Sequence, residues 1–159
     1  MTALRVLHVD DEPDIRKVVK LSLSLDPTFT VLGCGSGAEA IATAPDWSPD
    51  MILCDVVMPM MDGPATLKHL QACPRTADIP VVFMTARVQQ REIQQFKSLG
   101  AVGVITKPFD PMTLVGELRA CLASLRAASL QATSLGAERS RFVQRLRADA
   151  AILADCRTS

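Results

Sequence analysis

MILCDVVMPMMDG, residues 51–63, carries the pattern that decides the fold. Four apolar residues run without interruption into Asp55, and a proline-containing loop then ends at Gly63. A short apolar run that stops at polar and turn residues is typical of a strand buried on both faces of a sheet. LRVLHV before Asp10 and IPVVFM before Thr85 repeat this pattern. We therefore expect three buried strands, each followed by a polar side chain.

Two shorter apolar runs, FTVLG around Val31 and VGVI before Lys107, complete a set of five strands. Helical spacing or alanine-rich sequence occupies the gaps, so we expect helices over residues 12–25, 37–44, 64–72, 89–99 and 110–126. Strands that alternate with helices pair in parallel. The sequence predicts an α/β fold, a doubly wound five-stranded parallel sheet in (βα)5 order, followed by a C-terminal helical tail.

Length and composition exclude several classes of function. The chain of 159 residues fits one ordinary domain with a short appendage. No apolar run approaches the roughly 20 residues of a spanning helix, and the start is acidic, so we expect a cytoplasmic protein with no membrane partner. Lys plus Arg equals Asp plus Glu, at 17 each, which gives no indication of a nucleic-acid partner. The five cysteines lack a C-x-x-C pair, which argues against a zinc site.

Polar side chains follow four of the five expected strands. Asp10 and Asp11 follow the first strand, Asp55 the third, Thr85 the fourth and Lys107 the fifth. Functional groups in a doubly wound sheet gather at the carboxyl ends of the strands. In the common strand order 2-1-3-4-5 the third strand is central, which places Asp55 between the acidic pair and the other two side chains. We expect these five residues to form one site.

The residue types at this site suit phosphoryl transfer. Three carboxylates at close range raise one another's pKa unless a cation lies among them. Mg²⁺ suits this set because it prefers oxygen ligands and is commonly held by one or two carboxylates plus a phosphate oxygen. Lys107 offers a compact positive charge and Thr85 a hydroxyl donor for phosphoryl oxygens. Asp55 is the candidate nucleophile, because an aspartate can form an acyl phosphate.

Four motifs resemble those of the receiver domain of two-component response regulators. They are V-D-D-E at residues 9–12, D-V-V-M-P-M-M-D-G at 55–63, M-T-A at 84–86 and K-P-F at 107–109. The resemblance covers about residues 3 to 125. It implies a flavodoxin-like fold and division into a receiver domain over residues 1–126 and a helical extension over residues 127–159. It also implies a signalling domain that catalyses only its own phosphorylation and dephosphorylation.

The resemblance implies a role for each site residue. Asp55 would accept the phosphoryl group from a histidine kinase or a phosphotransfer protein, with Thr85 as the switch hydroxyl and Lys107 bound to the phosphoryl group. The residues implied to hold Mg²⁺ are Asp10, Asp11, Asp55 and, through its backbone carbonyl, Val57. The Lys107–Pro108 peptide bond would be cis, and the loop beside the site would be shaped by Gly63.

Several alternatives stay open at the level of single residues. Asp11 alone could cap the first helix, with Asp14 three residues later in a weak capping box. His8 fits a packed strand residue better than a phosphate acceptor. A phosphatase of the haloacid dehalogenase type also uses an aspartate nucleophile and Mg²⁺, but it needs a second acid where this chain has Val57. A scaffold that keeps only the fold is disfavoured by the complete set of site residues.

Two features depart from the receiver pattern. Receiver domains commonly carry an aromatic residue three positions before the lysine, and this chain has Val104 there. About 33 residues follow the receiver pattern, too few for a common DNA-binding domain, so we expect no direct DNA contact. Phe142, Leu146 and Leu153 recur at helical spacing in this tail. We expect its apolar face to dock on a second copy of the chain or on a partner helix.

Overall fold

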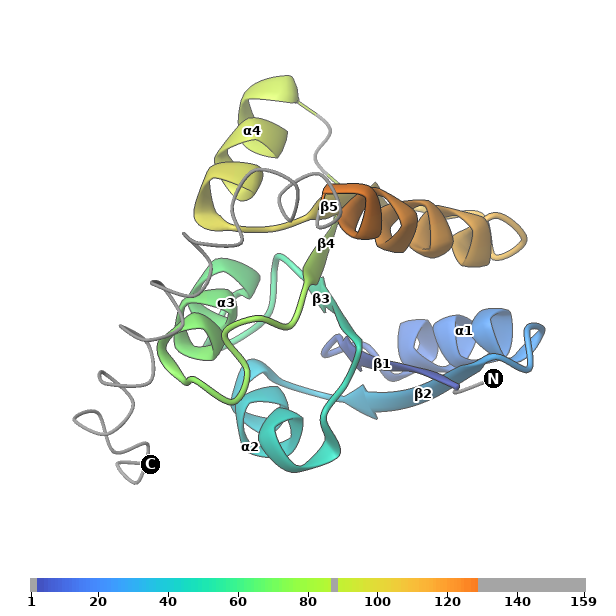
Figure 1. Cartoon of the computed structure of the whole chain (residues 1–159), viewed down its shortest axis with the longest axis horizontal. Coiled ribbons are helices and arrows are strands. Elements are labelled where there is room, and N and C mark those ends of the chain that lie inside the picture. Colours follow the sequence, from blue (N-terminus) through green and yellow to red (C-terminus); the bar gives the residue numbers. More distant parts are fainter. Residues whose placement is uncertain (1–2, 87–88, 129–159) are drawn as a thin grey trace. The chain divides into compact units, whose positions relative to one another are not determined.

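The computed structural model describes residues 3–86 and 89–128. The described strands form one parallel sheet in the order β2-β1-β3-β4-β5 (Figure 1). They are β1 Leu4–Val9, β2 Phe29–Cys34, β3 Met51–Asp55, β4 Val81–Thr85 and β5 Gly103–Thr106. The predicted strand order and parallel pairing are confirmed. Because β3 is central, its carboxyl end lies between those of β1 and β4.

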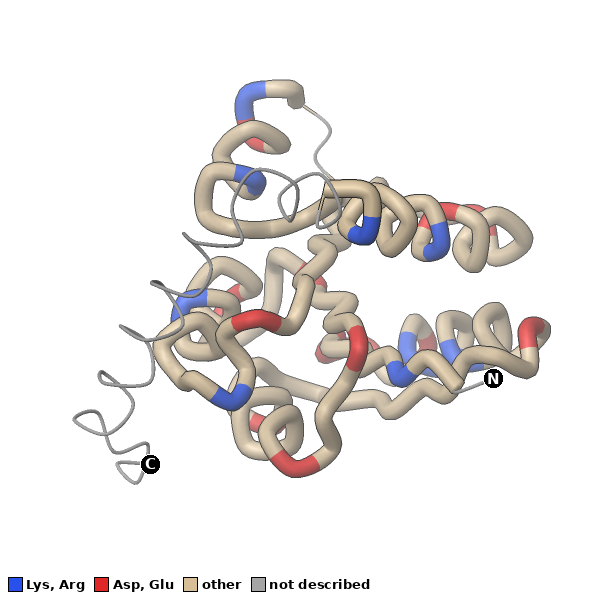
Figure 2. The backbone as a smooth tube through the Cα atoms, viewed as in Figure 1, with Lys and Arg blue, Asp and Glu red and all other residues tan. Residues whose placement is uncertain are grey.

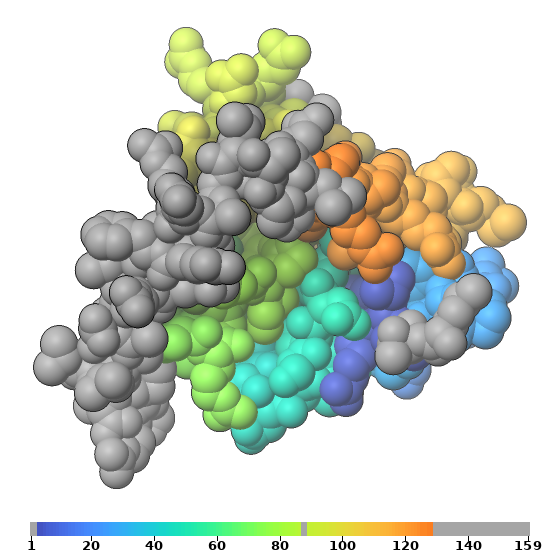
Figure 3. Space-filling model, in the orientation of Figure 1, coloured from blue at the N-terminus to red at the C-terminus, as the bar shows by residue number. Residues whose placement is uncertain are grey.

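The helices connect successive strands and lie on both faces of the sheet. They are α1 Pro13–Ser24, α2 Gly37–Trp47, α3 Gly63–Ala72 and α4 Gln90–Leu99, and residues 114–128 are also helical. Figure 1 shows α1 on one face and α2 and α3 on the other. The helices α2 and α3 contact each other, and the space-filling view (Figure 3) shows cyan and green parts of the chain side by side on this face. The doubly wound fold is therefore confirmed.

Two predicted helix boundaries were wrong. The second helix continues past residue 44 through Pro45 and ends at Trp47. The helix survives because proline removes only its own N–H, and the N–H of Ser48 still reaches the Ala44 carbonyl at 3.0 Å. The fifth predicted helix begins at residue 114 instead of 110, because residues 111–113 form a turn in which the Asp110 carboxylate accepts from the Met112 N–H.

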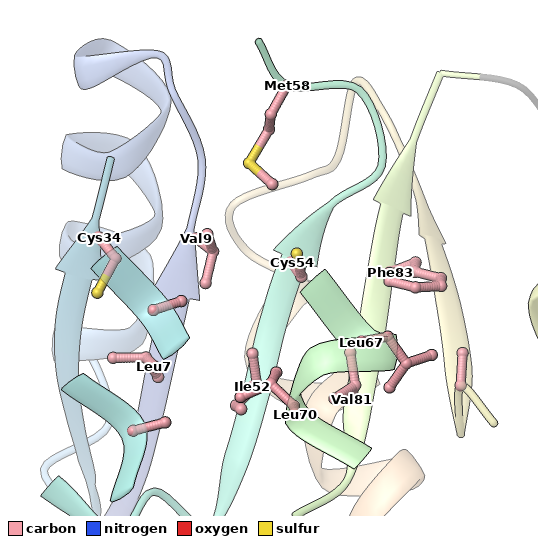
Figure 4. Packing of buried hydrophobic residues seen from close by; sticks show 13 residues of the cluster. Leu7, Val9, Cys34, Ile52, Cys54, Met58, Leu67, Leu70, Val81 and Phe83 are labelled. Carbon is pink, nitrogen blue, oxygen red and sulfur yellow. The ribbon is translucent and has the colours of Figure 1, made fainter. Parts of the chain in front are cut away.

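An apolar cluster fills the space between the sheet and the helices α2 and α3 (Figure 4). Ala40 and Ala44 of α2, and Leu67 and Leu70 of α3, supply the helical side of this cluster. Alternate residues of the strands supply the other side, with Met58 and Ala101 added from loops, and the buried strand members are Leu7, Val9, Cys34, Ile52, Cys54, Val81 and Phe83. Burial of this surface stabilises α3 directly after the β3 loop. The cluster therefore fixes the loop that follows Asp55.

The chain divides into two compact units, Met1–Leu118 and Arg119–Ser159. The first unit contains the whole sheet and helices α1 to α4, and it buries Leu114 and Leu118. In the second unit, residues 119–128 are described, and they are helical. The predicted tail helix with Phe142, Leu146 and Leu153 lies outside the described residues. Within residues 3–86 and 89–128, no helix has the length and apolar character needed to cross a membrane.

Candidate functional site

Three carboxylates meet at the carboxyl ends of neighbouring strands. Asp10 directly follows β1 and Asp55 ends β3, and the pairing of Val9 with Cys54 places them side by side. Asp10, Asp11 and Asp55 each offer an oxygen within 4.8 Å of the others. We call these three residues the acidic cluster. Asp10 is completely buried and the exposed fraction of Asp55 is 6%, whereas Asp11 is more open to water, so two of the three carboxylates are largely shielded from water.

Lys107 lies between two members of the acidic cluster. Its Nζ donates to Asp10 Oδ2 at 2.9 Å and lies 3.2 Å from Asp55 Oδ2. Burial alone would lower the pKa of Lys107, but the hydrogen bonds and charges of Asp10 and Asp55 outweigh it and raise that pKa above its ordinary value. The Lys107–Pro108 bond is cis, as predicted. The ammonium is therefore fully charged and pairs with both carboxylates.

Asp55 has a weakened tendency to ionise. Burial raises its pKa, the positive charge of Lys107 opposes that shift, and the negative charge of Asp10 adds to it. The N–H of Val57 lies 3.4 Å from Asp55 Oδ1, a long contact from the exposed loop. A cation near the acidic cluster would favour the ionised form that a nucleophile requires.

Gly63 lies directly behind the Asp55 backbone. A Cβ at position 63 would lie 2.7 Å from the Asp55 carbonyl oxygen and 2.9 Å from Val56 Cα. The Gly63 N–H donates to the Val56 carbonyl at 2.8 Å. Because both crowded atoms belong to the backbone, this position accepts only glycine without a shift of the chain. The structure thus places Gly63 where the sequence predicted that it shapes the loop.

Thr85 and Lys107 reach the site from the neighbouring strands. Thr85 ends β4 and is buried, one residue beyond the partner of Asp55 in the sheet. Its carbonyl accepts from the Lys107 N–H at 2.8 Å, which fixes the start of the β5 loop. The structure therefore brings all five side chains of the predicted site to one edge of the sheet.

His8 is a packed strand residue, as the sequence predicted. It is completely buried, and neither ring nitrogen has a hydrogen-bond partner. Burial lowers the pKa of His8 to about 4, even though the Asp10 carboxylate acts in the opposite direction. The imidazole is therefore neutral near pH 7, and its 4.0 Å approach to Asp10 Oδ2 is no ion pair.

The comparison with known families shows to which family this fold belongs. Residues 6–119 match the family described as the response regulator receiver domain. The chain belongs to this family. Phosphoryl acceptance by an aspartate is general among these receiver domains, which act in two-component signalling.

Individual relatives agree with this membership. Over 119 residues the receiver chain is 38% identical to the DNA-binding dual master transcriptional regulator RpaA of Synechocystis sp.; the match covers 74% of this chain and 48% of RpaA. It is 34% identical to protein PilH of Pseudomonas aeruginosa, with 75% of this chain and 98% of PilH covered. The chain thus spans about half the length of RpaA but nearly all of PilH.

A solved structure shows the same receiver fold. The chemotaxis response regulator CheY4 of Vibrio cholerae superposes with a TM-score of 0.71 at 33% sequence identity. The superposition covers 76% of this chain and 99% of CheY4. At this identity the agreement supports family membership as well as the fold.

One alternative for the receiver's acidic pair was wrong. The N-cap residue of α1 is Glu12, and no side chain caps this helix. Pro13 occupies the first turn, where its missing N–H costs nothing. Asp11 is therefore not the cap, and its carboxylate lies with Asp10 and Asp55.

Sequence reasoning missed two features of the receiver site. Arg16 of α1 donates from Nη1 to the Asp10 carbonyl at 2.7 Å. Met60, in the loop after Asp55, adopts a φ of 69° and is fully exposed, although a bulky residue rarely occupies this left-handed region. The position of Arg16 one helical turn after Glu12 was the available signal for the first feature, and no sequence pattern indicated the second.

Proposed function

We propose that Asp55 of this receiver domain accepts a phosphoryl group in a Mg²⁺-dependent reaction. The observation that carries the proposal is the position of Lys107 Nζ, at 2.9 Å from Asp10 Oδ2 and 3.2 Å from Asp55 Oδ2. A phosphoryl group on Asp55 would receive positive charge from this ammonium. The family, in which an aspartate is the general acceptor, supports the same assignment.

The oxygen donors around Asp55 fit Mg²⁺. Asp10, Asp11 and Asp55 would hold the ion together with the backbone carbonyl of Val57. This oxygen-only set matches the preference of a hard divalent cation, and the charge on three close carboxylates needs such a cation. When bound, Mg²⁺ would neutralise charge that develops on the phosphoryl oxygens.

The chain's own residues would carry out the transfer. An Asp55 carboxylate oxygen forms a bond to phosphorus while the bond from phosphorus to the donor's imidazole nitrogen breaks, and the electron pair stays on the imidazole. Lys107 would hold one phosphoryl oxygen, and the Thr85 hydroxyl would donate to another. The donor would be a histidine kinase or a phosphotransfer protein. The receiver would then catalyse only its own phosphorylation and the hydrolysis that ends the signal.

Exposed apolar side chains near the site support a protein donor. Val57 and Met60 are exposed in the loop that follows Asp55. Large apolar side chains on a surface are candidates for protein contact. We therefore propose that these side chains contact the phosphodonor protein. Lys and Arg on α1 (Figure 2) would add charge pairing with an acidic partner surface.

The output would be a conformational change read by another protein. With Val104 in place of an aromatic residue, the change would reach the surface through the Thr85 hydroxyl and the loop after β4. We propose that residues 1–126 form the receiver and residues 127–159 an extension that binds a second copy or a partner helix. The whole protein would act in the cytoplasm.

Incubation with acetyl phosphate and Mg²⁺, followed by intact mass measurement, tests this function. We expect one phosphoryl adduct on the wild type, none on Asp55→Asn and none when EDTA removes the metal. Asp46→Asn is the matched control, because this aspartate lies on the surface with its side chain 86% exposed. An adduct that persists in Asp55→Asn would overturn the assignment of Asp55.

A further inference from the structure

Arg16 connects α1 to the backbone of the acidic cluster. Its Nη1 donates to the Asp10 carbonyl at 2.7 Å, a short bond for a charged donor. The side chain of the same aspartate is held independently, since Oδ1 accepts from the Glu12 N–H at 2.9 Å and Oδ2 from Lys107. Arg16 thus restrains the main chain at the point where β1 ends and the acidic pair begins.

Two glycines leave room for the path of Arg16 across β2. A Cβ at position 33 would lie 3.4 Å from Arg16 Cδ, and a Cβ at position 35 would lie 3.4 Å from Arg16 Nη1. The Gly35 N–H in turn donates to Glu39 Oε2 at 2.8 Å. A Cβ at either glycine would therefore touch the Arg16 side chain and reduce the space open to it.

From this geometry we infer that Arg16 is a positioning residue for the metal-binding acid pair. By holding the Asp10 carbonyl, Arg16 sets the direction in which the Asp10 and Asp11 side chains leave the end of β1. The guanidinium does not contact the carboxylates themselves in any described hydrogen bond. The inference rests on the proposed function, because it concerns the affinity of that site for Mg²⁺.

Removal of the Arg16 charge changes the Mg²⁺ affinity in opposite directions for a positioning role and for a purely electrostatic one. The guanidinium on the Asp10 carbonyl is a positive charge at the edge of the site and repels an incoming Mg²⁺, so removal of its charge alone would raise the affinity for the metal. Loss of positioning acts in the opposite direction, because ligands that are no longer oriented bind the metal less tightly. A role in global stability alone would lower the urea midpoint and leave the affinity of the folded protein unchanged.

The experiment is calorimetric titration of the metal-free full chain with Mg²⁺, alongside urea unfolding in EDTA. We expect Arg16→Met to bind Mg²⁺ about tenfold more weakly than the wild type, with Arg16→Lys between the two. Lys17→Met is the matched control, because it removes the same charge from an exposed neighbouring position. It should bind Mg²⁺ as tightly as the wild type or more tightly.

Gly33→Ala keeps the arginine and its charge but adds a methyl group in contact with Arg16 Cδ. Because this contact limits the positions open to the guanidinium, we expect Mg²⁺ binding that is weaker by a factor of about three. Gly33→Ala also provides the test if Arg16→Met does not fold. The inference would be overturned if folded Arg16→Met binds Mg²⁺ as tightly as the wild type or more tightly. If Arg16→Met is unfolded, wild-type affinity of Gly33→Ala for Mg²⁺ would overturn it. Absence of Mg²⁺ binding by the wild type would instead overturn the proposed function, and the inference with it.

Discussion

The apolar cluster is buried, and so are Asp10 and Asp55 of the acidic cluster, but burial has opposite consequences for the two regions. The apolar cluster fills one face of the sheet with aliphatic and aromatic side chains (Figure 4). Phe96 packs edge-on against Phe83 of this cluster, with ring centroids 5.3 Å apart. The acidic cluster puts carboxylates beside a histidine whose ring nitrogens have no partner. The first region stabilises the fold, whereas the second holds reactive groups at a cost in stability. Substitutions in the two regions should therefore act with opposite signs.

Truncation of Leu70 should give the largest effect. Leu70 of α3 is 1% exposed within the apolar cluster, so Leu70→Ala leaves a cavity and should lower the free energy of unfolding by about 3 kcal/mol. Urea unfolding in EDTA measures this loss in the free energy of unfolding. Lys68→Ala on the exposed side of the same helix is the control and should change the value by less than about 0.5 kcal/mol. Equal losses in the two variants would contradict the description of the cluster.

Gly63→Ala tests the junction between the two regions. The added methyl group would crowd the Asp55 carbonyl oxygen and Val56 Cα, so we expect a loss of about 2 kcal/mol in unfolding free energy. Phosphorylation by acetyl phosphate should also slow, because the Asp55 backbone shifts. Gly116→Ala is the control, since nothing lies within 4 Å of its added Cβ. Because alanine favours a helix more than glycine does, this variant should raise the free energy of unfolding by about 0.5 to 1 kcal/mol.

His8 should make stability depend on pH. Its pKa falls from an ordinary 6.5 to about 4 in the folded chain, so its stabilising contribution is complete above pH 6.5 and is lost as pH falls toward 4. Between pH 7 and pH 5 the wild type in EDTA should lose about 2 kcal/mol more than His8→Val. Urea midpoints across this range provide the measurement. Parallel pH profiles for the two proteins would show that burial does not lower the pKa of His8.

Asp55→Asn should act in the opposite direction from the core truncation, with the smallest magnitude. Because burial raises the pKa of Asp55, the stability associated with its neutral form is lost as pH rises through the folded-state pKa. Removal of the ionised form at pH 7 in EDTA should then stabilise the chain by about 1 kcal/mol. A decrease in the urea midpoint would mean that the ion pair of Asp55 with Lys107 stabilises the fold by more than the burial of the Asp55 carboxylate destabilises it.

The two clusters also differ in how far sequence could predict them. The apolar runs that end at Asp10, Asp55 and Thr85 have strand length, and alternation with helices leaves few sheet topologies. Strand order then brought the polar side chains to one edge. Helix ends were less predictable, since the continuation through Pro45 depends on a hydrogen bond to Ala44 that no local pattern reveals.

The sequence by itself determined the parallel sheet and the residue types at its carboxyl edge, because periodicity and the direction of parallel strands depend only on the order of residues along the chain. Tertiary structure alone decided that Lys107 bridges Asp10 and Asp55, that Arg16 reaches the Asp10 carbonyl across two glycines, and that His8 is neutral. These features depend on the distances between side chains remote in sequence and on their exclusion from water, which packing alone sets.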